Sequence, residues 1–75
     1  MATAIVQGDL IGQSPKAWKL ECVMMDGTRS HVWFPKSVVS YRRTEPANSH
    51  GVAHTTLEVP DYVAEGKRVD YEEKE

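Results

Sequence analysis

Hydrophobic and polar side chains alternate from Lys16 to Met25, and this is the clearest pattern in the chain. A period of two is typical of a β-strand with one buried and one exposed face. The apolar face holds Trp18, Leu20, Cys22 and Met24, and the opposite face holds Lys19, Glu21 and Val23. The pattern therefore predicts a half-buried strand.

The dipeptide Asp26-Gly27 follows directly and predicts a two-residue hairpin turn, because these residues readily adopt the positive φ angles that such a turn needs. In that turn Met25 pairs with Thr28. The cross-strand pairs that follow are Leu20 with Trp33, Cys22 with His31 and Met24 with Arg29. This register places Trp33 on the face of the apolar cluster and Phe34 on the other face.

The rest of the chain also reads as short strands and tight turns. We expect a bent strand over residues 3–11, a corner at Pro35-Lys36-Ser37, strands over residues 38–41 and 52–59, and a short helix over residues 60–66. The predicted fold is mainly β: a small antiparallel five-stranded barrel or bent sheet of the SH3-like or OB-like kind, with a short C-terminal helical turn. Residues 1–66 form the single small β domain, and residues 67–75 form a charged, flexible tail.

Composition limits the number of domains, the cellular compartment and the classes of ligand. A chain of 75 residues forms one small domain of marginal stability, so self-association is expected. Cys22 is the single cysteine, which excludes an internal disulfide and favours a reducing, cytoplasmic location. No apolar run approaches the roughly 18 residues that cross a bilayer, so no membrane contact is expected. The net charge of −2 argues against a strong general phosphate binder, although it allows a local basic patch.

Three short motifs carry a resemblance to a known group of proteins. They are Lys16-Ala17-Trp18, the corner from Trp33 to Ser37, and the closing segment from Leu57 to Glu65. Together they resemble small phage and prophage accessory proteins, although Tyr62 stands where tryptophan is usual there and Gly66-Lys67-Arg68-Val69 replaces a Lys-Gly-Leu ending. The resemblance implies a viral origin, the cytoplasm of a bacterial host and a small β-rich domain. It implies no catalytic residue.

Metal binding and nucleophilic catalysis each have a weak candidate set. His50 and His54 are four residues apart, and the predicted register brings Cys22 opposite His31, so these four side chains are the candidates for a tetrahedral metal site. Cys22 and His31 could also form a thiolate–imidazole pair. The favoured interpretation is a buried structural cysteine and solvent-exposed histidines. We therefore expect neither a cofactor nor an enzymatic activity.

Two classes of binding function remain. Three cations lie near three aromatic rings in the middle of the chain, the combination that OB-like barrels use for single-stranded nucleic acid. These candidate residues are Trp33, Phe34, Lys36, Tyr41, Arg42 and Arg43.

The leading hypothesis is a non-catalytic accessory protein that binds a host protein, for example to inhibit a host defence system, or binds its own copy. In this hypothesis the strand over residues 3–11 lies at the edge of the sheet and can extend a partner's sheet. The single-strand binding module is the alternative.

Overall fold

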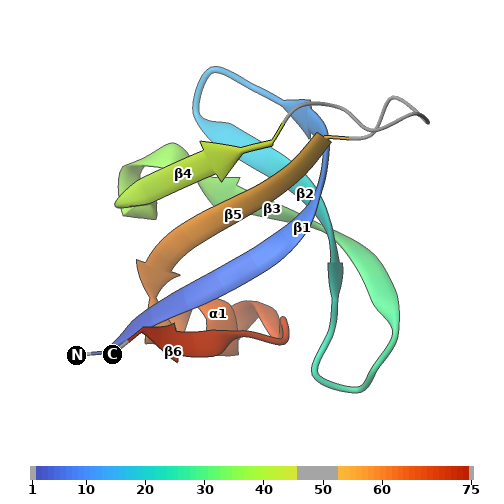
Figure 1. Cartoon of the computed structure of the whole chain (residues 1–75), viewed down its shortest axis with the longest axis vertical. Coiled ribbons are helices and arrows are strands. Elements are labelled where there is room, and N and C mark those ends of the chain that lie inside the picture. Colours follow the sequence, from blue (N-terminus) through green and yellow to red (C-terminus); the bar gives the residue numbers. More distant parts are fainter. Residues whose placement is uncertain (1, 46–52, 75) are drawn as a thin grey trace.

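The computed structural model describes residues 2–45 and 53–74, and in these residues the chain is mainly β (Figure 1). Its elements are β1 (Thr3–Gln13), β2 (Ala17–Val23), β3 (Arg29–Pro35), the 3-10 helix η1 (Lys36–Val38), β4 (Tyr41–Thr44), β5 (Ala53–Pro60), α1 (Asp61–Lys67) and β6 (Glu72–Lys74). The strands form one antiparallel, strongly bent sheet, as predicted, with six strands described rather than five. The sheet is not closed into a barrel, because in the described residues β3 and β4 end it without pairing with each other.

The sheet is built around β1. Its strand order is β3-β2-β1-β5-β4, and β6 also pairs with β1. β1 pairs with β5 from Thr3 to Leu10 on one side, and with β2 from Gly8 to Gln13 on the other. The prediction that residues 3–11 form an edge strand is therefore wrong. β1 is central because it pairs with strands on both of its edges, and its inward-facing residues Ala4 and Val6 are fully buried.

The β2–β3 hairpin differs from the prediction by one residue. The Met24 N–H donates to the Thr28 carbonyl over 2.6 Å, which leaves a three-residue loop in which Gly27 has a φ of 88°. The observed pairs include Leu20 with Val32 and Trp18 with Phe34, and Cys22 lies opposite Ser30, not His31. A one-residue slip exchanges the two faces of a strand, so Phe34 is fully buried and Trp33 is exposed.

The C-terminal segment fills a fork between β1 and β2. β1 pairs with β2 only from Gly8 onward. Before Gly8 the two strands separate, and residues 68–74 lie between them (Figure 1). Val69 bridges to Met24 and is fully buried, and the Asp70 N–H donates to the Val23 carbonyl over 2.9 Å. Residues 67–74 are thus packed into the domain that we expected to end at residue 66. Burial of Val69 and backbone pairing of β6 with β1 hold the segment there.

The corner and the helix lie close to their predicted positions. Pro35 precedes η1, so the strand predicted over residues 38–41 begins only at Tyr41. α1 starts directly after Pro60 and ends at Lys67, one residue beyond Gly66, which we expected to close it. Its C-cap is Arg68, which adopts the left-handed conformation.

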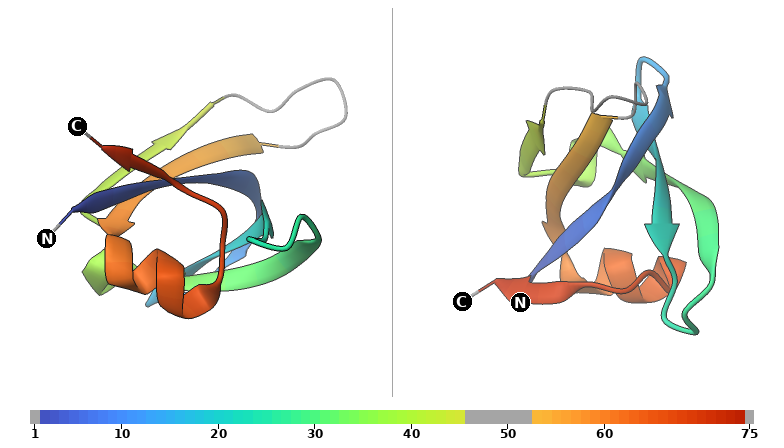
Figure 2. Two further views of the ribbon diagram at one scale, coloured as in Figure 1. Left: turned by 90° about the horizontal axis from the view of Figure 1, so that it is seen from below. Right: turned by 45° about the vertical axis from the view of Figure 1, so that its right-hand side comes forward.

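α1 lies at the end of the bent sheet where the two termini also lie, and its Ala64 completes the core (Figure 2). The buried core consists of Ala4, Val6, Leu20, Cys22, Val32, Phe34, Leu57, Val59, Ala64 and Val69.

Candidate functional site

The structure divides the predicted binding residues among three places. Phe34 is in the core and unavailable to a ligand. Tyr41 and Arg43 lie opposite Glu58 and Thr56 on the outer face of the sheet. The other three residues lie at the end of the β2–β3 ribbon away from the hairpin loop. Lys36 and Arg42 contact Trp18, a residue that we had assigned to the core alone, and Trp33 lies on the opposite, outer face.

Trp18 is the centre of this group. The Nζ atom of Lys36 lies 4.1 Å from the centroid of its ring, and the Cζ atom of Arg42 lies 4.5 Å from it. The ring is half-buried and packs against the core, so it is a fixed platform for the two cations. Cation–aromatic contacts at exposed positions stabilise by about 0.5–1 kcal/mol each, enough to bias both side chains toward this geometry.

Backbone pairing brings the two cations to the Trp18 ring. The Lys36 N–H donates to the Lys16 carbonyl over 2.8 Å, which holds η1 beside the start of β2. Arg42 pairs with Leu57, so its side chain shares the inner face of the sheet, and its Nη1 atom donates to Thr44 Oγ1 over 2.7 Å. The Lys-Ala-Trp motif singled out Trp18 in the sequence. No residue near that motif predicts the contact of Trp18 with Arg42 of β4, which is distant in the chain.

A second indole lies on the outer face of the same ribbon. Trp33 is 44% exposed, and Lys19, its cross-strand neighbour on β2, places Nζ 5.6 Å from the ring centroid. We call the five residues Trp18, Lys19, Trp33, Lys36 and Arg42 the tryptophan–cation cluster. It occupies the end of the β2–β3 ribbon that lies away from the hairpin loop.

In the part of the chain that the structure describes, no carboxylate forms an ion pair with a cation of this cluster. Among residues 2–45 and 53–74, the lysine and arginine ion pairs join Arg29 to Asp9 and Glu21, and Lys74 to Glu58. None involves Lys19, Lys36 or Arg42. These three charges are therefore available to an anionic ligand.

His31 and His54 lie on the outer face, in a polar row that crosses four strands. Cross-strand pairing aligns His54, Asp9, Glu21 and His31 in that order. His31 Nε2 is 3.8 Å from Glu21 Oε1, and His54 Nδ1 is 4.0 Å from Asp9 Oδ1. Arg29 contacts both carboxylates, at 3.3 and 3.1 Å, and offsets the repulsion between these neighbouring acids.

This arrangement separates the candidate metal ligands. Cys22 faces the core, whereas His31 and His54 face outward and are separated by two strands; His50 lies outside the described residues. In the part of the chain that the structure describes, no three His, Cys, Asp or Glu side chains are arranged to hold a metal ion.

Cys22 is also unsuited to nucleophilic chemistry. It is 1% exposed, and burial raises the pKa of its thiol to about 11. The reactive form of cysteine is the thiolate, so the thiol is unreactive at neutral pH. His31 is on the opposite face and cannot accept its proton, so the predicted pair does not form.

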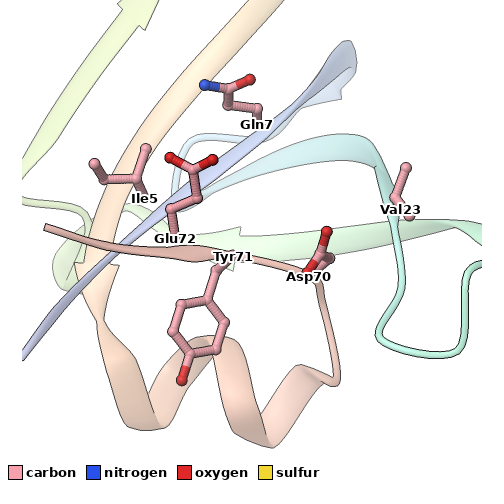
Figure 3. A pocket seen from close by; sticks show the side chains of 6 residues that line it. All are labelled: Ile5, Gln7, Val23, Asp70, Tyr71 and Glu72. Carbon is pink, nitrogen blue, oxygen red and sulfur yellow. The ribbon is translucent and has the colours of Figure 1, made fainter.

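A small hollow of about 190 Å³ lies where β1, β2 and the C-terminal segment meet (Figure 3). It is lined by Ile5, Gln7, Val23, Asp70, Tyr71 and Glu72. The Tyr71 ring points toward α1, where its hydroxyl donates to Glu65 Oε1 over 2.9 Å, and this bond raises the pKa of Tyr71 to about 12. The side chains that line the hollow therefore include no activated nucleophile.

Comparisons with known protein families, curated proteins and solved structures found no match. In the described residues, no helix has the length and apolar character needed to cross a membrane. The function must therefore be argued from the site itself.

Proposed function

We propose that this protein is a non-catalytic binding module that holds single-stranded nucleic acid on the tryptophan–cation cluster. The observation that carries the proposal is the placement of Lys19, Lys36 and Arg42 against two indole rings, with no carboxylate paired to any of the three in the described residues. Single-strand binding sites combine backbone-tracking cations with rings on which bases stack.

The two tryptophans have different roles in this proposal. Trp33 is exposed and can stack on a base, an interaction that contributes about 1–3 kcal/mol. Trp18 packs against the core and holds Lys36 and Arg42 in position for phosphates.

A second candidate function is binding of a host protein by a phage-encoded accessory protein, for example to inhibit a host defence system. The observation that favours it lies at the hairpin end of the β2–β3 ribbon, where Val23 and Met25 are 40% and 52% exposed. A hollow of about 480 Å³ adjoins them, lined by Met24, Met25, Asp26, Thr28, Ser30 and Arg68. Methionine side chains adapt readily to different partners. The viral setting rests on the sequence resemblance alone.

Binding of fluorescently labelled oligonucleotides, measured by anisotropy at several salt concentrations, tests the main proposal. With three cations contacting phosphates, the slope of log K against log salt should be about −2, so affinity should fall about 20-fold between about 50 and 200 mM salt. Trp33→Ala should weaken binding roughly 5- to 150-fold. Tyr62→Ala is the matched control, because Tyr62 is an exposed ring on α1, 56% exposed against 44% for Trp33, and its loss should have no effect.

Absence of binding to any single-stranded oligonucleotide at low salt would refute this function. The host-protein candidate predicts a different result: wild-type protein captures a defined partner from a bacterial lysate, and Met25→Glu loses it while Trp33→Ala retains it.

A further inference from the structure

The outer edge of β3 is the least protected sheet edge in the described residues. β3 has seven residues, pairs only with β2, has no bulge in that pairing and contains no lysine. Proline stands only at its last position, Pro35. The edges at β4 and β6 are shorter, with four and three residues, and carry Arg42, Arg43 and Lys74. Natural proteins blunt free edges with short strands, bulges and charges. β3 is neither short nor bulged, and its single charged residue is Arg29 at its first position.

The backbone groups on this edge can be assigned from the hairpin. Hydrogen bonds join Met24 to Thr28 and Lys36 to Lys16, which marks the bonded pairs at both ends of the β2–β3 ladder. In an antiparallel pair, residues alternate between facing the partner strand and facing away. The N–H and C=O groups of Arg29, His31 and Trp33 therefore point away from β2.

We propose that two copies of the protein associate edge to edge through β3, with a two-fold axis at His31. In this arrangement His31 lies opposite His31 of the second copy, and Arg29 lies opposite Trp33 of the second copy. All three outward-facing residues of each strand pair through both backbone groups, so the two sheets become continuous.

The side chains of β3 allow it to pair with β3 of a second copy. The charge of Arg29 is balanced within its own sheet, because its guanidinium lies 3.3 Å from Asp9 and 3.1 Å from Glu21. The Arg29 guanidinium is therefore ion-paired within its own sheet and needs no carboxylate from the second copy. Trp33, which is 44% exposed, gains the stem of an arginine beside its ring. An isologous contact of this kind closes after two copies and does not propagate into a fibre.

The association also brings the two outer faces onto one surface. The two Trp33 side chains are then four residues apart along the paired strands, about 14 Å at a strand rise of about 3.4 Å per residue. The inference is independent of the proposed ligand, since it rests on the sheet edge alone.

A charge placed on the axis tests the proposal. The wild-type mass in solution, measured by light scattering or sedimentation, should be twice the 8.4 kDa of the chain. His31→Lys should give a monomer, because like charges directly opposite each other are destabilising and a lysine in the middle of an edge strand disfavours edge-to-edge pairing. His54→Lys is the matched control, since His54 lies in the same polar row beside Asp9 but away from the edge, and it should remain a dimer.

A covalent test distinguishes this contact from other modes of association. Residues directly opposite in a bonded antiparallel pair have Cα atoms about 5.5 Å apart, within the range that a disulfide spans. Mild oxidation should therefore cross-link His31→Cys protein into dimers, but not His54→Cys protein; Cys22 is buried and should not interfere. A monomeric wild-type protein at high concentration, or equal behaviour of the His31 and His54 variants, would overturn the proposal.

Discussion

Gly8 occupies the point where β1 and β2 separate, and its replacement by alanine is the sharpest test of the described packing. A Cβ atom at Gly8 would lie 2.7 Å from the Glu21 carbonyl oxygen and 3.0 Å from Cys22 Sγ. Since the first of these contacts is with backbone, it cannot be relieved by rotating a side chain. The two strands must move apart, in a sheet whose registers on both sides are set by β1.

The expected loss of stability follows from these contacts. Overpacking of a tightly packed site costs about 1–3 kcal/mol. Alanine also reduces the entropy of the unfolded chain, which offsets about 0.4–1 kcal/mol. The net loss is on the order of 1–2 kcal/mol, which for a domain of this size lowers the melting temperature by about 5–15 °C.

Gly12→Ala is the matched control on the same strand. Its added Cβ would meet no atom closer than 3.8 Å, the Cβ and Cδ atoms of Lys19. This variant should melt at or slightly above the wild-type temperature. Thermal unfolding followed by circular dichroism or tryptophan fluorescence measures both variants, and equal melting temperatures would show that β1 and β2 do not approach as described.

Two further predictions concern the C-terminal segment and the buried thiol. Val69→Ala should lower the free energy of unfolding by about 1–3 kcal/mol, because Val69 is fully buried. The control is Asp70→Ala, which should have little effect because Asp70 is exposed. Equal urea midpoints for the two variants would mean that this segment does not pack on the domain. Cys22 should resist thiol reagents at about pH 8 until the protein unfolds, because the thiolate is the reactive form. The pKa of Cys22 rises from 9.0 in the unfolded chain to about 11 in the folded protein, because burial favours the neutral thiol. The contribution of Cys22 to the free energy of unfolding is therefore fully present below pH 9 and is lost as the pH rises to 11. Cys22→Ala should flatten that alkaline decline in urea midpoint, and an unchanged decline would assign it to other groups.

Local patterns in the sequence were sufficient to locate most elements of this fold. Alternation marked β2, and Asp26-Gly27 marked the hairpin. Pro60 and Asp61 marked the start of α1. These features depend on residues close together in the chain, since backbone conformation and capping are local properties.

Register, strand order and the composition of the site were decided only by tertiary structure. Asp26-Gly27 is compatible with a two-residue turn and with a three-residue loop that has Gly27 in a positive-φ conformation, and the choice between them exchanges the faces of Trp33 and Phe34. Burial of large side chains made that choice, because Phe34 fills the core and leaves Trp33 outside. The contact of Arg42 with Trp18 likewise depends on β4 pairing with β5, far along the chain from β2. The sequence therefore determined which segments form strands, while packing around β1 determined which side chains a ligand can reach.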